Sequence, residues 1–283
     1  MKSLKNLSSM RELIKAVSED LNVDRNEAEL VVAALINRPR FELYMRNSID
    51  EQERVMLRSR IAQLKNGMPI EYVTNRVQFR NYTLKIFHGV FIPRMETEYF
   101  IELIPGMLPN APRKILEIGT GCGAISIALA DLYHDAEILA TDISGSAIQN
   151  SRENIIALKM ESQISIVRCD LYEGIKDKFD LIISNPPYIP SERMQMLPES
   201  VREFEPLTAI DGGKQGIEFI KRVILEGRGH LADAGVIALE IDEDSIDSLK
   251  VFLATQNIGS FMFCKDPCNK QRFLFLGAIN EKS

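Results

Sequence analysis

The feature that most constrains the fold of this chain is a regular alternation of short apolar strands and helical segments from about residue 97 onward. Helical patterning, as over 123–133 and 144–159, separates most of the strands. Parallel strands need a long crossover, usually a helix, so this rhythm predicts a doubly wound, mostly parallel sheet. The expected strands are 114–119, 137–143, 163–170, 179–185, 235–241, 259–265 and 271–279.

The last two expected strands are joined in a different way. The link between them contains Pro267 and is too short for a crossover helix, so these strands must pair antiparallel as a hairpin. The predicted fold is therefore an α/β, Rossmann-like sheet of seven strands that is parallel except for one antiparallel strand near its end.

Two regions of different character precede this sheet. Residues 1–66 have helical periodicity, with capping-box spacing at Asp24/Glu27 and again at Asp50/Glu53. Apolar and polar residues then alternate on both sides of Arg80, as in a β-hairpin. We therefore predict an N-terminal helical bundle over 1–66 with a recognition role, a linker with a β-hairpin over 67–96, and an α/β domain over 97–283.

Composition narrows the class of protein. The 283 residues are 45% hydrophobic, enough for a sizeable core, and the net charge of −6 argues against a dedicated duplex-DNA binder. The four cysteines form no C-x-x-C pair, which favours free thiols, and Cys264 and Cys268 lie four apart with no histidine nearby, which favours no metal site. We find no signal-peptide core and no run of about 20 apolar residues. These features predict a soluble, cytoplasmic protein with no membrane partner.

A glycine-rich loop follows the first strand directly. Its sequence, Gly119-Thr120-Gly121-Cys122-Gly123-Ala124, leads at once into a helix, and such glycines let the chain turn sharply and a ligand approach the backbone.

Asp142, followed by Ile143, ends the second strand, where a carboxylate can accept hydrogen bonds from both hydroxyls of a ribose. Loop and acid together predict a nucleoside site. The loop alone leaves the cofactor open, since Gly119, Gly121 and Ala124 also have the spacing of dinucleotide-binding folds.

Glu117 distinguishes between the candidate cofactors. It stands two residues before Gly119, where a carboxylate repels a pyrophosphate but can meet the cationic methionyl part of S-adenosylmethionine, directly or through water. Asp170, at the end of the third strand, is placed to accept from an adenine amino group or to serve only as a turn residue. We therefore predict S-adenosylmethionine as the cofactor, with S-adenosylhomocysteine as its product.

The fourth strand ends in Asn185-Pro186-Pro187-Tyr188. An amide nitrogen is a weak nucleophile because its lone pair is delocalised, so a methylase must hold the NH2 group and aim it. The Asn185 side-chain oxygen and the Pro186 carbonyl can each accept one N–H, and Tyr188 offers a ring for a planar group to stack on. This tetrapeptide predicts methylation of a planar nitrogen, mostly by positioning. We assign catalysis to Asn185, Pro186 and Tyr188, and substrate binding to these residues and Pro187.

The chain resembles the bacterial release-factor glutamine methyltransferases beyond these motifs. The resemblance covers roughly residues 67–277 and rests on five segments. They are 67–72 (Gly-Met-Pro-Ile-Glu-Tyr) with Phe79, 91–98 (Phe-Ile-Pro-Arg-Met-Glu-Thr-Glu), 204–206 (Phe-Glu-Pro), 211–213 (Asp-Gly-Gly), and Lys265-Asp266 with Arg272. Met95, Asn75 and Cys122 depart from the family's usual proline, glycine and threonine, and Asp244 lies near a usual glutamine.

The resemblance implies methyl transfer to N5 of the glutamine in the Gly-Gly-Gln tip of class I peptide-chain release factors, the expected protein partner. Carried over by position, the cofactor would be held by 119–123, Asp142 with Ile143, the Asp170-Leu171 corner and Asn185, and the glutamine by 185–188.

Three other functions compete with this interpretation. A methylase of exocyclic amino groups in DNA or RNA fits the tetrapeptide equally well, but residues 1–66 contain no dense Lys/Arg run and no stable nucleic-acid partner is expected. A nicotinamide-dependent oxidoreductase would need a hydride site, and the three histidines neighbour no motif. A non-catalytic binding module would leave the tetrapeptide as a coincidence.

Overall fold

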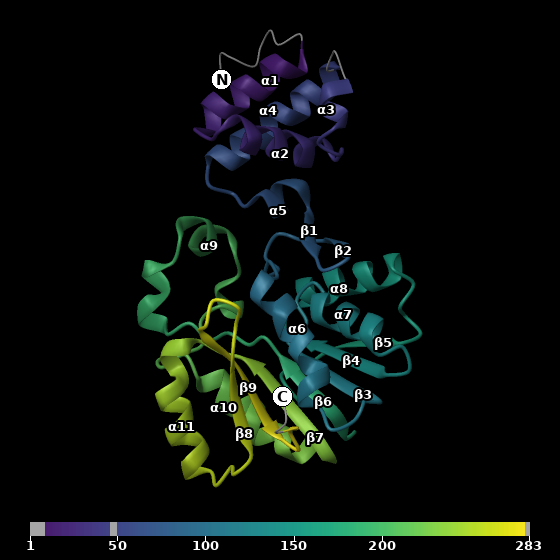
Figure 1. Cartoon of the computed structure of the whole chain (residues 1–283), viewed down its shortest axis with the longest axis vertical. Coiled ribbons are helices and arrows are strands. Elements are labelled where there is room, and N and C mark those ends of the chain that lie inside the picture. The colour runs from purple at the N-terminus through teal and green to yellow at the C-terminus, as the bar shows by residue number, and fades with distance from the viewer. Residues whose placement is uncertain (1–8, 46–49, 281–283) are drawn as a thin grey trace. The chain divides into compact units, whose positions relative to one another are not determined.

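The structure, a computed structural model, describes residues 9–45 and 50–280. The chain forms two compact units, Met1–Arg76 and Val77–Ser283 (Figure 1). Within the described ranges, no helix is both long and apolar enough to cross a membrane.

The N-terminal unit is a helical bundle. Its helices are α1 (Met10–Leu21), α2 (Arg25–Ile36), α3 (Glu42–Met45), α4 (Glu51–Lys65) and α5 (Ile70–Thr74). The side chains of Asp24 and Asp50 accept from the backbone N–H three residues on, at 2.9 and 2.8 Å, as the capping-box spacing predicted. Ser9 and Glu12 form a further, reciprocal capping box at α1 that our sequence analysis did not identify. The apolar faces of these helices meet in one core, which includes Leu13, Val17, Val32, Leu35, Leu57 and Ile61.

The predicted β-hairpin is present, and all of it except Arg76 belongs to the second unit. It pairs β1 (Arg76–Phe79) with β2 (Tyr82–Lys85). Two asparagines of helix α8 (Gly145–Ala157) accept from the backbone N–H groups of Lys85 and Phe87, both at 2.8 Å. One of them, Asn154, also donates to the carbonyl of Cys122 at 2.8 Å, so the hairpin and the glycine-rich loop share an anchor.

Two departures from the family pattern have local explanations. Asn75 ends α5 with a φ of 52°, a left-handed conformation that glycine adopts freely and asparagine tolerates. Met95 is the first residue of helix α6 (Met95–Met107), the position where proline is favoured in helices, and it is 82% exposed. Neither substitution disturbs the backbone that it occupies.

The second unit is built on a seven-stranded sheet with the order β5-β4-β3-β6-β7-β9-β8. Every neighbouring pair is parallel except those of β9, which runs antiparallel to β7 and β8. The prediction of a mostly parallel sheet with one antiparallel strand is confirmed. The strands are β3 (Lys114–Ile118), β4 (Glu137–Asp142), β5 (Ile164–Arg168), β6 (Phe179–Ser184), β7 (Leu231–Glu240), β8 (Phe261–Lys265) and β9 (Gln271–Gly277).

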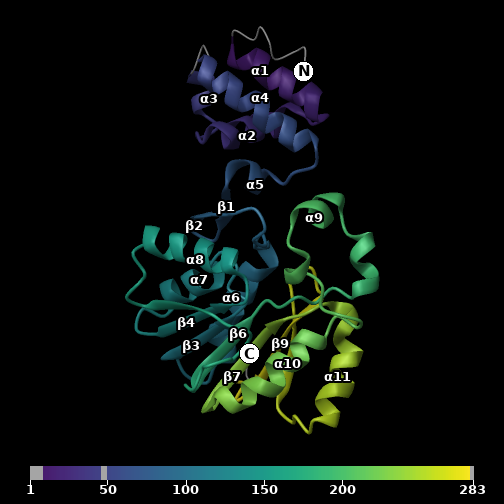
Figure 2. The ribbon, with the colours of Figure 1, turned by 180° about the vertical axis from the view of Figure 1, so that it is seen from behind.

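Helices cover both faces of the sheet. The remaining helices are α7 (Ala124–Leu132), α9 (Glu199–Phe204), α10 (Glu218–Gly227) and α11 (Ile246–Thr255), with short 3-10 helices at Ser191–Met196, Leu207–Ala209, Arg228–His230 and Glu243–Ser245. In both views α10 and α11 lie next to each other, and so do α7 and α8 (Figure 1, Figure 2). Helix α10 contacts β7, and α7 and α8 contact β4.

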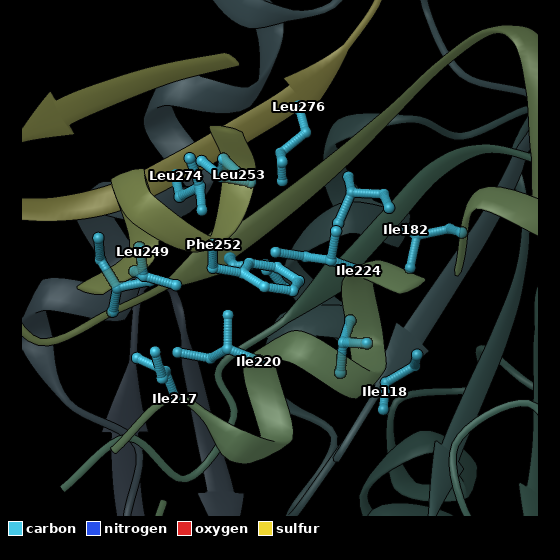
Figure 3. Packing of buried hydrophobic residues seen from close by; sticks show 14 of the residues in the cluster. Ile118, Ile182, Ile217, Ile220, Ile224, Leu249, Phe252, Leu253, Leu274 and Leu276 are labelled. Atoms are coloured by element: carbon cyan, nitrogen blue, oxygen red, sulfur yellow. The ribbon is translucent and has the colours of Figure 1, made fainter. Parts of the chain in front are cut away.

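Strand β9 buries side chains on both faces of the sheet. Leu274 and Leu276 pack with Ile220 of α10 and Leu249 of α11 in one hydrophobic core cluster (Figure 3). The intervening Phe273 and Phe275 face the other way and contact a phenylalanine of α6, one of them stacked at 5.0 Å. Successive strand residues point to opposite faces, so α6 lies opposite α10 and α11 in a three-layer sandwich.

Candidate active site

A cleft opens at the carboxyl ends of β3, β4 and β6, where the strand order reverses direction. In doubly wound sheets ligands bind at this kind of position. Its volume is about 1040 Å³ including the part open to solvent. The sequence-predicted site residues that line it are Glu117, Gly119, Thr120, Gly121, Cys122, Asp142, Ile143, Asp170, Leu171, Asn185, Pro186 and Pro187.

The glycine-rich loop presents open backbone to the cleft. Gly119 and Gly121 have φ angles of 75° and 56°, and nothing lies within 4 Å of where their Cβ atoms would be. Only glycine adopts such angles without strain, and the absent side chains leave room for a ligand. Gly123 differs: a Cβ there would meet the Cβ of Ser151 at 3.2 Å, and Gly123 does not line the cleft. Its left-handed conformation, with a φ of 87°, forms the start of α7 instead.

Asp142 is held by the loop that it faces. One carboxylate oxygen accepts from the backbone N–H of Gly121 at 3.0 Å, and the other accepts from that of Ser144 at 2.9 Å. Burial raises the pKa of this carboxyl, and the two N–H groups oppose that shift. Each oxygen keeps a second lone pair with which it can accept from a ligand hydroxyl.

Glu117 is a buried carboxylate with one used and one unused oxygen. Oε2 accepts from the Thr120 hydroxyl at 2.8 Å and the Ser126 backbone N–H at 3.0 Å, and also from the Ser126 hydroxyl. Oε1 has no partner among the described residues. Burial raises the pKa of Glu117 to about 7. A buried acceptor without a donor is unfavourable, so the wall of the cleft contains a place for a ligand cation or hydrogen-bond donor.

Asp170 is engaged elsewhere. Its carboxylate accepts from both terminal nitrogens of Arg222, at 3.4 and 3.0 Å, and the pair is nearly half exposed. Leu171, next in the chain, is buried with a φ of 50°. The corner is thus a tight turn on the cleft wall.

The 185–188 segment belongs to a buried hydrogen-bond chain. The Asn185 side-chain nitrogen donates to the hydroxyl of Thr97 at 3.0 Å, and that hydroxyl donates to Oε2 of Glu240 at 2.8 Å. The Tyr188 hydroxyl donates to the other oxygen of Glu240 at 3.1 Å. Since the Asn185 nitrogen is used by Thr97, its oxygen is the atom left to act as an acceptor.

Comparisons with known proteins agree with this geometry. Residues 81–201 match the family model of the methyltransferase small domain, and residues 10–74 match that of the PrmC N-terminal domain. A release factor glutamine methyltransferase of Rhodopirellula baltica is 33% identical over 88% of each chain, and one of Aquifex aeolicus is 32% identical over 88% of each. The chain belongs to the release factor glutamine methyltransferase family.

Solved structures place this member of the family among Rossmann-like methyltransferase folds. The hMettl16 catalytic domain in complex with the MAT2A 3'UTR hairpin 6 aligns with a TM-score of 0.57 at 19% identity, over 71% of this chain and 77% of that one. At this identity the likeness concerns the fold alone. The described part of the chain contains no group of three or more His, Cys, Asp or Glu side chains that could hold a metal ion.

A second, mostly apolar cavity adjoins the cleft of this protein. It has about 530 Å³ of empty space, including the part open to solvent, and shares Phe91, Asn185, Pro186 and Ala209 with the cleft. Tyr188 lines this second cavity and not the first. The tetrapeptide therefore separates two spaces, and Asn185 and Pro186 face both.

The lining of the second cavity also depends on an ion pair. Arg94 donates to one oxygen of Glu205, and the other oxygen accepts from the backbone N–H of Ile92 at 3.2 Å. The Glu205 side chain is 1% exposed. This pair joins the segment before α6 to the segment after α9.

Our sequence analysis missed Thr97, Glu240 and Glu205 as site residues. Thr97 and Glu205 lie in segments that carry the family resemblance, and Glu240 lies near the end of a predicted strand, but nothing local reveals a role for them. Thr97 and Glu240 are 143 positions apart in the chain, so only the folded sheet brings them together.

Proposed function

We propose that this protein transfers the methyl group of S-adenosylmethionine to N5 of the glutamine in the Gly-Gly-Gln motif of class I peptide-chain release factors. The observation that carries this proposal is the Asn185 amide, which is fixed at the boundary of two cavities with its oxygen free to accept. Family membership supports the same activity, since the relatives are named for it.

The cleft fits S-adenosylmethionine. The unpartnered oxygen of Glu117 suits the cationic amino group of the methionyl part, and Asp142 suits the ribose hydroxyls. The open loop at Gly119 and Gly121 allows close approach of the ligand to the backbone. Asp170 and Leu171 would contact the base. When bound, the cofactor supplies an electrophilic methyl group on a sulfonium centre.

The 185–188 segment would hold the nucleophile. The Asn185 oxygen and the Pro186 carbonyl accept the two N–H groups of the glutamine amide, and Tyr188 packs against its plane. The nitrogen is thereby aimed at the cleft, a bond to the methyl carbon forms as the sulfur–carbon bond breaks, and one amide proton passes to solvent. The nitrogen becomes more acidic on methylation, so a strong base is not required. Positioning accounts for most of the catalysis.

The second cavity suits the glutamine and its neighbours. Its lining is mainly apolar, and its one cation, Arg94, is already paired with Glu205. A substrate segment with small residues beside the glutamine can enter it, and glycines meet that demand while permitting unusual backbone angles. We further propose that the N-terminal helices bind the release factor away from the glutamine, and that the reaction takes place in the cytoplasm.

The test is to incubate the full-length protein with labelled S-adenosylmethionine and, separately, purified release factor, tRNA or duplex DNA. We expect label on the release factor, located at the Gly-Gly-Gln glutamine by mass spectrometry. A release factor with Gln→Asn at that position should stay unlabelled, because the amide falls one methylene short. A short Gly-Gly-Gln peptide should be a much poorer substrate than the whole factor. Label on a nucleic-acid base and none on the release factor would refute the proposal.

A further inference from the structure

We propose that Glu240 and Thr97 are positioning residues for methyl transfer. Together they set the direction of the Asn185 amide, and Glu240 also holds the Tyr188 side chain; Thr97, which lines the cleft, acts through its bond to Asn185. This inference concerns how the site of the proposed function is held in place, and it rests on that function only for the identity of the acceptor.

The direction of the hydrogen bonds follows from the acceptor at the end of the chain. An ionised carboxylate has no proton, so the Thr97 hydroxyl must donate its single proton to Glu240. Thr97 can then offer only a lone pair to Asn185. The asparagine therefore turns its NH2 group toward Thr97 and its oxygen away, toward the cavities that it lines.

This orientation matters because the two ends of an asparagine amide are nearly identical in shape. Packing alone does not distinguish them, whereas a donor-acceptor network does. With the amide reversed, the NH2 group of Asn185 would face the NH2 group of the substrate, and two donors cannot bond. The substrate nitrogen would lose one of the two acceptors that aim it.

The same carboxylate also restrains Tyr188. The tyrosine hydroxyl donates to the second oxygen of Glu240, so both oxygens of this side chain are occupied. Burial raises the pKa of Tyr188 well above its usual value, and the neighbouring Glu240 raises it further, so the phenol stays a donor. One buried group therefore orients both side chains that flank the two prolines.

Glu240 has no direct access to either cavity. It is 1% exposed, lies at the end of β7, and is absent from the lining of both spaces. The charged or titratable groups that act on it are Arg272, Glu96 and Tyr188. Burial raises the pKa of Glu240 to about 7, which Thr97, Tyr188 and Arg272 oppose. Its effect on the reaction must therefore pass through Thr97 and Tyr188.

The first test uses Thr97→Val, which keeps the shape of the side chain and removes the hydroxyl. Turnover is measured at saturating S-adenosylmethionine, with whichever acceptor the wild-type protein methylates. We expect kcat to fall by about 10- to 100-fold, as for a misplaced reacting group. Thr97 lines the cleft but is assigned no bond to the cofactor, and valine keeps the shape of that wall, so the Kd for S-adenosylhomocysteine should stay within about twofold. Thr97→Ser should recover most of the lost turnover.

The matched control is Thr255→Val, in helix α11, whose hydroxyl donates to the carbonyl of Phe252 in its own helix at 2.7 Å. Its kcat should equal that of the wild type. A Thr97→Val protein that turns over at the wild-type rate, or a Thr97→Ser protein as slow as Thr97→Val, would overturn the inference. If the wild type labels a nucleic acid instead of a release factor, the proposed function fails while this test still stands, because the comparison is made on the acceptor that is labelled.

The second test uses Glu240→Gln and the dependence of kcat on pH. The ionised form is the one that imposes the bond direction, so wild-type kcat should fall as pH drops below about 7 and level off above it. Saturating cofactor keeps Glu117, with a similar pKa, out of this profile. Glu240→Gln should be slow and lack that step, while its melting temperature verifies folding. A folded Glu240→Gln protein with wild-type kcat and an unchanged profile would contradict the assignment.

Discussion

Two buried glutamates stand on either side of strand β6, and they differ in what they leave free. Glu117 and Glu240 are each 1% exposed, and burial raises the pKa of each to about 7. Glu117 lines the cleft and keeps one oxygen without a partner. Glu240 lines neither cavity, and hydroxyl groups occupy both of its oxygens.

The difference separates a binding role from a positioning role. An unsatisfied buried acceptor is complete only when a ligand supplies a donor or a positive charge. A buried acceptor whose hydrogen bonds are all made within the protein has no need of a ligand, and it holds the neighbouring side chains in one arrangement. Burial and pKa alone would have given both residues the same role, and the hydrogen-bond partners distinguish them.

The largest effect is expected at Asn185, which hydrogen bonds join to Glu240 through Thr97. Asn185→Ala removes the acceptor that holds the substrate nitrogen, so kcat should fall by about 100-fold or more. Loss of the bond to Thr97 should lower the free energy of unfolding by only about 1 kcal/mol. Single-turnover rates at saturating cofactor, together with thermal denaturation, separate the two effects. Near wild-type turnover would remove Asn185 from the mechanism.

The next largest effect is expected in the cleft that Glu117 lines, where substitutions should weaken cofactor binding. Asp142→Ala removes the proposed bonds to ribose and also releases the N–H groups of Gly121 and Ser144. Cofactor binding should weaken by about 1.5–3 kcal/mol. Titration calorimetry with S-adenosylhomocysteine measures this. An unchanged Kd would mean that the cofactor does not contact the end of β4.

The pH dependence of cofactor affinity tests the binding role of Glu117. Binding of a cationic amino group favours the ionised form of Glu117, so binding should release a proton, and affinity should rise as pH increases through about 7. Below that pH, affinity should fall by up to about tenfold per unit. Glu117→Gln should bind more weakly at pH 8 and lose this step. Asp142, whose pKa is also raised, is present in both proteins, so the difference between the curves reports Glu117. Identical curves would contradict the binding role.

The smallest expected effect is at Asp170. Arg222 already satisfies this exposed carboxylate, so Asp170→Ala should weaken cofactor binding by about 1 kcal/mol or less. The same calorimetric titration applies. A loss as large as that for Asp142→Ala would show that Asp170 contributes to the site as strongly as the ribose-binding acid.

Local sequence patterns were sufficient to predict the fold of this protein. The βαβ rhythm, the short link at Pro267 and the helix caps at Asp24 and Asp50 each depend on residues close together in the chain, and the structure contains the sheet, the antiparallel strand and the caps that they predict. The glycine-rich loop and the residues at the ends of β3, β4 and β6 were found in the same way. Parallel strands bring their carboxyl ends to one edge, so a list of strand ends is also a list of candidate site residues.

The sequence by itself thus determined the fold class, the family and many of the side chains that line the cleft, although not Thr97. Only the tertiary structure decided which of those side chains are free and which are held. Thr97 and Asn185 are 88 positions apart, and Tyr188 and Glu240 are 52 apart. Hydrogen bonds between residues so far apart produce no repeating pattern in the sequence. They form only when folding brings α6 and the ends of β6 and β7 together. Glu117 and Glu240 are both acids at strand ends in the sequence, and the fold gives them different partners and hence different roles.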